Sequence, residues 1–79
     1  MSTLIRLSDQ EILMGFVASC IEDVADKLCV DYYEVYMRMK NVGMIENYIF
    51  PHYDVLHTES RENVTMGLLE TLKRWEEMQ

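Results

Sequence analysis

The strongest constraint on the fold is the spacing of apolar residues in the first third of the chain. They recur three or four positions apart, at Leu13, Phe16, Val17, Cys20, Ile21, Val24, Ala25 and Leu28. This spacing places them on one face of an α-helix. Ser8 with Glu11 three residues later is a capping box, which marks a helix start. The pattern predicts a helix over about 9–28, and Ile12 and Met14 widen its apolar surface beyond one stripe.

A second capping box at Asp31 and Glu34 predicts another helix, which ends at residues 41–43. Gly43 is expected to take the left-handed conformation that stops helices. Residues 44–57 keep a helical period, but Pro51 interrupts it, because proline removes an amide and clashes with the preceding turn. This stretch is either a short helix over about 44–49 followed by a turn-rich or helical segment, or a single kinked helix.

The last helix is predicted over about 60–77, capped by Thr58 or Ser60. Gly67 lies inside it and costs about 1 kcal/mol of helix propensity relative to Ala. Such a glycine is typical of a close approach between helices. No strand-like run, repeat or linker is found. The sequence predicts an all-α fold, a compact bundle of four or five short helices in a single domain spanning 1–79, with residues 1–7 disordered or extended.

Charge and hydropathy narrow the functional classes. The 79 residues carry a formal net charge of −7, which repels phosphate backbones and anionic lipid. We therefore expect no general nucleic-acid binding and a preference, if any, for a basic partner. The apolar runs are far short of the ~20 residues that span a bilayer, and residues 1–7 lack the apolar region of a signal peptide. These features predict a cytoplasmic protein without a membrane segment.

Candidate catalytic groups do not form a known constellation. His52, Asp54 and His57 are close in sequence, but ligands five apart diverge around a helix, whereas metal ligands on helices are usually three or four apart. We expect His57 to lie at a helix end and to bond the backbone. Cys20 with His57 and Asp54 is a conceivable nucleophilic set, but Cys20 lies in the apolar stripe, where thiols are inert. The sequence predicts no enzyme, no cofactor and no metal.

Two binding surfaces are conceivable. Residues 31–41 could act as the second helix of a helix-turn-helix, with Arg38 and Lys40 facing outward, although the net charge argues against this. The five tyrosines and seven methionines are many for one small core. These residue types are enriched at protein interfaces, so they predict either a core edge or a protein-binding patch.

The segment over residues 48–58 carries a resemblance to a known family. It reads Tyr48-Ile49-Phe50-Pro51-His52-Tyr53-Asp54-Val55-Leu56-His57-Thr58. It is similar to the Tyr-Ile-x-Pro-x-Tyr-[Asp/Glu]-x-Leu-His-Thr segment of a family of small uncharacterised bacterial proteins, a domain of unknown function. Glu34-Val35-Tyr36 and Gly43-Met44-Ile45 look like further positions of that family. The resemblance covers about residues 10–72 and implies a helical fold, a bacterial source and no known catalytic residues.

The resemblance also implies a partner. Members of that family are often encoded beside proteins that look like ADP-ribosyltransferase toxins, which implies an accessory or neutralising role. The function expected here is a non-enzymatic interaction module, antitoxin-like, that binds a protein partner or a second copy of itself. The alternative is a helix-turn-helix-like DNA-binding regulator. The candidate structural or interaction core comprises Tyr36, Tyr48, Pro51, Tyr53, Leu56, His57 and Thr58.

Overall fold

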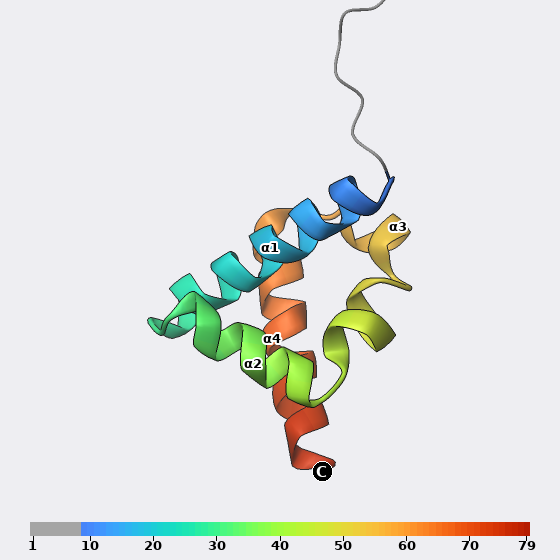
Figure 1. Cartoon of the computed structure of the whole chain (residues 1–79). Coiled ribbons are helices and arrows are strands. Elements are labelled where there is room, and N and C mark those ends of the chain that lie inside the picture. Colours follow the sequence, from blue (N-terminus) through green and yellow to red (C-terminus); the bar gives the residue numbers. More distant parts are fainter. Residues whose placement is uncertain (1–8) are drawn as a thin grey trace, which may run out of the picture.

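The computed structural model describes residues 9–79, which fold into helices joined by short connections (Figure 1). The elements are α1 (Asp9–Leu28), α2 (Tyr32–Asn41), the π-helix η1 (Ile45–Ile49), α3 (Tyr53–Leu56) and α4 (Arg61–Glu77). Residues 9–79 contain no strand. The predicted all-α bundle is therefore confirmed. The predictions for residues 1–7 and for a cap at Ser8 lie outside the described residues.

α1 is the element that the others pack around. α1 and α2 are joined by residues 29–31 and form a V in Figure 1, while α4 crosses behind both of them. η1, yellow-green in the figure, and α3 lie at the open end of the V. The main contacts between elements are those of α1 with α4 and of α1 with α2.

The core is built from the predicted apolar faces. α1 buries Val17, Cys20, Ile21, Val24 and Ala25, as its spacing predicts. The other elements and their connections contribute Val35, Met39, Met44, Ile49, Val64, Leu68, Leu69 and Leu72. Burying an aliphatic side chain of this size stabilises the fold by about 1.5–3 kcal/mol. This set therefore supplies most of the driving force available to so short a chain.

The end of α1 is a Schellman motif with a cysteine in the position that glycine usually takes. The Val30 amide donates to the Ala25 carbonyl at 3.0 Å, and the Cys29 amide donates to the Asp26 carbonyl at 3.2 Å. Cys29 has φ +58°, the left-handed region in which a side chain is disfavoured. The exposed thiol thus lies on a strained turn between α1 and α2.

Gly43 ends α2 as predicted, with φ +72°. A Cβ at this position would lie 2.8 Å from Nδ2 of Asn47, so the Asn47 side chain would have to move to admit it. The predicted side-chain cap at the start of α2 is wrong. Asp31 holds the N-cap position through its extended backbone, but its carboxylate accepts no capping hydrogen bond. Ser60 does cap α4, because its Oγ accepts from the Asn63 amide at 3.1 Å.

Pro51 separates two helical segments instead of kinking one. In η1 the Phe50 amide donates to the Ile45 carbonyl, five residues back, at 3.0 Å. Proline has no amide to continue an α-helical ladder, and its ring would clash with the carbonyl four residues before it. The chain then turns and restarts as α3 at Tyr53. The π-helix itself was not predicted from the sequence.

The structure also contradicts the expectation that Gly67 marks a close approach between helices. A Cβ at Gly67 would meet no atom within 4 Å, so this glycine does not mark a close helix approach. The space beside Gly67 is open. No packing contact therefore offsets the low helix propensity of this glycine in α4.

We predict that Cys29→Gly stabilises the protein by up to about 1 kcal/mol, because glycine removes the Cβ penalty of the left-handed turn. Urea unfolding followed by circular dichroism gives the free energy of unfolding. Cys29→Ala is the control, since it removes the thiol but keeps the Cβ. An equal gain in Cys29→Ala would show that the thiol, and not the backbone, was responsible.

We predict that Gly67→Ala raises the free energy of unfolding by about 1 kcal/mol, the difference in helix propensity. Gly43→Ala is the contrasting variant and is expected to lower the free energy of unfolding by about 1–2 kcal/mol, since it forces a Cβ into a left-handed turn. The same unfolding experiment measures both. Destabilisation by Gly67→Ala would contradict the open space seen beside this residue.

Candidate interaction surface

A groove of about 450 Å³ lies between α1, α2 and η1. We call it the α1/α2 groove and define it by the residues that line it. These are Gln10, Met14, Val17, Ala18, Ile21, Tyr32, Tyr36, Lys40, Gly43, Ile45, Glu46 and Phe50. The lining is mainly apolar, and one base and one carboxylate lie on different walls. Its volume is within the range of about 300–1,000 Å³ typical of ligand-binding pockets.

The walls of the groove follow from helical spacing. Met14 and Ala18 are four residues apart and form a second stripe on α1 beside the core stripe, whose residues Val17 and Ile21 also line the groove. On α2, Tyr32, Tyr36 and Lys40 are each four residues apart and share one face. Because α1 and α2 diverge from their short connection, these two stripes face each other across the groove.

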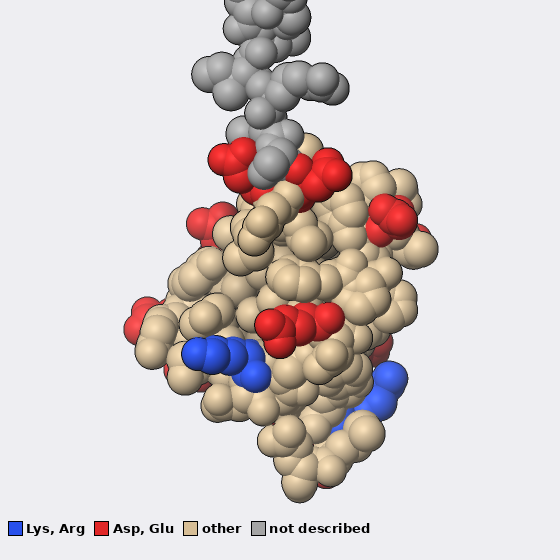
Figure 2. Space-filling view, turned by 45° about the vertical axis from the view of Figure 1, so that its right-hand side comes forward, with Lys and Arg blue, Asp and Glu red and all other residues tan. Residues whose placement is uncertain are grey.

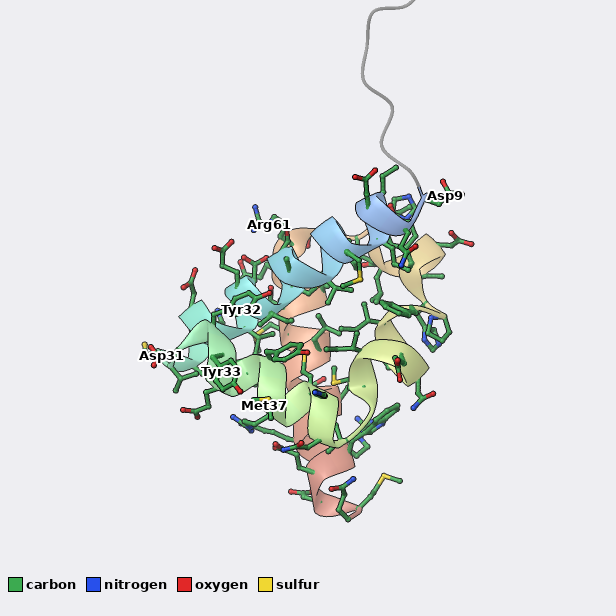
Figure 3. All side chains as sticks on the ribbon, in the orientation of Figure 1. Asp9, Asp31, Tyr32, Tyr33, Met37 and Arg61 are labelled. Carbon is green, nitrogen blue, oxygen red and sulfur yellow. The ribbon has the colours of Figure 1, made fainter. Side chains whose placement is uncertain are left out.

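Apolar surface in the groove is accessible to solvent. Met14 is 48% exposed and Tyr32 is 45% exposed, while the Lys40 ammonium lies over the Tyr36 ring at 5.9 Å from its centre. Figure 3 shows Tyr32 and Tyr33 on α2, and Tyr33 is 67% exposed with its ring 6.2 Å from that of Tyr36. Large exposed aromatic groups of this kind are enriched in protein interfaces. The sequence flagged Tyr36 and Met14, but it gave no signal for Ala18 or Phe50.

Two consecutive turns share one tyrosine–histidine arrangement. His52 donates from Nδ1 to the Tyr48 carbonyl at 2.7 Å, and His57 donates from Nδ1 to the Tyr53 carbonyl at 2.8 Å. A carbonyl oxygen only accepts, so Nδ1 carries the proton in both rings. Each imidazole also lies against the tyrosine ring, with centres 4.7 Å and 4.6 Å apart. The expectation that His57 bonds the backbone at a helix end is confirmed.

These tyrosines fasten the connection between α2 and α4 to the rest of the molecule. The Tyr48 ring meets Trp75 of α4 edge-on at 5.9 Å, and the Tyr53 ring meets Phe16 of α1 edge-on at 5.2 Å. Edge-to-face pairs of this kind add about 0.5–1.5 kcal/mol beyond burial. Leu56 packs against the core from the same segment.

Six of the seven residues of the candidate structural or interaction core lie in the connection between α2 and α4. The seventh, Tyr36, lies apart from them in the α1/α2 groove. Pro51, His57 and Thr58 are exposed, and the Thr58 hydroxyl donates to the Val55 carbonyl at 2.8 Å. The connection thus works as a structural support beside the groove, and Tyr36 contributes to the groove itself.

The conceivable nucleophilic set around Cys20 is not assembled. Cys20 and His57 line one small hollow, whereas Asp54 lines another. Burial first, and the nearby Asp23 carboxylate second, raise the pKa of the Cys20 thiol to about 12 against the opposing effect of Arg61. At neutral pH the thiol is protonated and lacks the thiolate needed for nucleophilic attack. In residues 9–79 no three His, Cys, Asp or Glu side chains converge on a possible metal position.

Two arginines fasten α4 to the V. Arg38 of α2 donates from Nε and Nη2 to both carboxylate oxygens of Glu76, at 2.8 Å and 2.7 Å. This hydrogen bond lowers the pKa of Glu76 below its usual value and raises the pKa of Arg38. Arg61 makes the same two-pronged contact with Asp23 of α1, at 3.0 Å and 2.7 Å. Arg61 is labelled at the start of α4 in Figure 3.

The Arg38 pair bears on the DNA-binding alternative. Of the two bases expected to face outward from residues 31–41, Arg38 is neutralised by Glu76 and Lys40 lies over Tyr36. This face therefore offers little free positive charge to phosphate.

Comparisons with known proteins give a family but no activity. The model of a family described as "Protein of unknown function (DUF3791)" matches residues 15–75. No curated protein and no solved structure matches the chain. A family of unknown function agrees with the resemblance seen in the sequence. Among the described residues no helix is long and apolar enough to cross a bilayer.

We predict that Glu76→Gln lowers the free energy of unfolding at pH 7 by about 0.5–1 kcal/mol, as expected for a partly exposed ion pair. Because the pKa of Glu76 is lowered in the folded state, its contribution is complete above the ordinary value of 4.5 and is lost as the pH falls through the lower folded value. Urea unfolding of both proteins at pH 7 and pH 3 should therefore give a smaller difference at pH 3 than at pH 7.

Glu62→Gln is the matched control for this prediction. Glu62 faces Lys27 at 3.7 Å and is 76% exposed, so its loss should change stability little at either pH. A Glu76→Gln deficit that persists undiminished in acid would show that the contribution of Glu76 is not electrostatic.

Proposed function

Because the chain belongs to the DUF3791 family of proteins of unknown function, its family brings no activity with it, and we propose that it is a non-enzymatic protein-interaction module. The observation that carries this proposal is the α1/α2 groove, an apolar hollow whose rim leaves Met14 and Tyr32 about half exposed. Soluble proteins usually cover apolar surface of this kind with a partner. The groove receives an apolar segment of another protein.

Electrostatics supports a basic partner. The net charge of −7 attracts a cationic protein and speeds its encounter. The protonated thiol of Cys20 and the use of both histidine Nδ1 atoms by the backbone support a role without covalent chemistry.

The sequence resemblance adds a candidate identity for that partner. In this proposal the chain is the antitoxin-like partner of a neighbouring toxin that looks like an ADP-ribosyltransferase. The chain neutralises it by occupying its surface and not by modifying it.

We predict that blocking the groove abolishes partner binding. Ala18 is exposed in the groove, so Ala18→Arg fills it with a long cationic side chain at little cost to helix propensity. Tagged full-length protein is used to recover partners from the organism that encodes it, followed by mass spectrometry. A partner recovered in stoichiometric amount by the wild type should be reduced at least about tenfold with Ala18→Arg.

Met66→Arg is the control, because Met66 is 42% exposed on α4 and lies outside the groove. Thermal melts confirm that both variants are folded. Equal recovery of the same partner by wild type and Ala18→Arg would overturn the proposal. So would a light-scattering mass showing a dimer that Ala18→Arg dissociates, since the occupant would then be a second copy.

A further inference from the structure

A second hollow of about 390 Å³ borders the α1/α2 groove at Phe50, which lines both. The second hollow lies between the start of α1 and the segment around Pro51. Its remaining lining is Asp9, Ile12, Leu13, Pro51, Tyr53 and Asp54. An occupant that fills the groove and extends past Phe50 therefore reaches a surface with an apolar floor and two carboxylates.

The charges that line the groove and the second hollow are unevenly distributed. Asp9 and Asp54 are exposed, and neither forms an ion pair with a base of residues 9–79. Glu46 lines the groove itself. Figure 3 shows Asp9 at the start of α1 beside α3, at the opposite end of α1 from Asp31. Figure 2 shows carboxylates beside the start of α1, and one further acidic and one basic side chain near the centre of the same view.

The base that lines the groove is on the other wall. Lys40 belongs to α2, and its ammonium is held over the Tyr36 ring. It does not neutralise Asp9 or Asp54 in an ion pair. The surface is therefore an apolar groove with negative charge at one end. A matching partner carries positive charge at the corresponding end.

We infer that the occupant is an amphipathic helix whose apolar stripe lies in the α1/α2 groove and whose basic residues, at one end, lie over Asp9 and Asp54. This inference rests on the proposed function and names the chemistry of the partner segment. The α1 wall from Gln10 to Ile21 is about 16 Å long at 1.5 Å per residue, which is three helical turns. An apolar stripe at i, i+3, i+4 and i+7 supplies anchors over that length.

Lysine and arginine suit the second hollow for a physical reason. Their aliphatic stems cover apolar surface while the charged group stays in water. Here the stem lies on Ile12, Leu13 and Pro51, and the cation is attracted by the two carboxylates at the rim. An acidic residue in the same place would be repelled.

The test uses synthetic helical peptides of about 14 residues, or four turns, as probes. Each carries leucines at i, i+3, i+4 and i+7, with two lysines at either the N-terminal or the C-terminal end. Matched peptides carry two glutamates in place of the lysines, and scrambled peptides lose the leucine stripe. Binding to the full-length isotope-labelled chain is measured by NMR titration at low and at physiological salt.

A lysine peptide should bind the wild type with shifts at the groove residues, and more weakly as salt rises. The double variant Asp9→Asn/Asp54→Asn should weaken its binding about fivefold to tenfold, since each exposed ion pair contributes up to about fivefold. Asp26→Asn/Glu70→Gln is the matched control. It removes the same charge from exposed positions outside both hollows and should change binding less than about twofold.

The outcomes separate this inference from the proposed function. If glutamate peptides bind as tightly as lysine peptides, or if the two double variants weaken binding equally, the inference is wrong. In that case, binding of either peptide that is lost in Ala18→Arg still supports the groove as the docking site. If no lysine peptide binds the wild type, the inference also fails, and the proposed function is then judged by partner recovery alone.

Discussion

The fold depends on the burial of one of two adjacent apolar stripes on α1. One stripe, which includes Val17, Ile21 and Val24, is covered on folding by α4 and α2 and forms the centre of the core. The second stripe, through Met14 and Ala18, has no such cover and forms a wall of the α1/α2 groove. The helix that stabilises the molecule thus also supplies its most accessible apolar surface. A bundle of this length has too few elements to cover every side of its central helix.

The segment between α2 and α4 explains how that surface is kept open. η1 and α3 lie at the open end of the V, and Phe50, which connects them, lines both the groove and the second hollow. Their position is fixed by the ring contacts of Tyr48 with Trp75 and of Tyr53 with Phe16, and by the two histidines that bond the preceding turns. These contacts add to the burial of Met44 and Ile49 in the core, which anchors the same segment. The family-like segment therefore both supports the surface and contributes to it, through Phe50 in the groove and Asp54 in the second hollow.

The sequence was a good guide wherever a local rule decides the structure. The bounds of α1 follow from its apolar spacing, Ser60 caps α4, and Gly43 takes the left-handed turn because little else tolerates it. The failures are positions where tertiary structure decides. Asp31 starts α2 without using its side chain, the space beside Gly67 depends on distant elements, and the π-helix reflects how Pro51 is accommodated. The sequence predicted only part of the groove lining. Ala18 looks like any other helical alanine in the sequence, and only the position of α2 shows that it lines a groove.

The two arginine–carboxylate pairs, Arg38–Glu76 and Arg61–Asp23, have a consequence for the order in which the helices fold together. α1 and α2 are joined by residues 29–31, so their contact requires the closure of a very short loop. The Arg38–Glu76 and Arg61–Asp23 pairs each join residues 38 positions apart, so both require a long loop to be closed. Chain entropy opposes long closures more than short ones, and contacts between distant residues slow folding. The α1–α2 hairpin is thus the unit that forms at the lowest cost in chain entropy. α4 then packs on it and stabilises it once the intervening turns have formed.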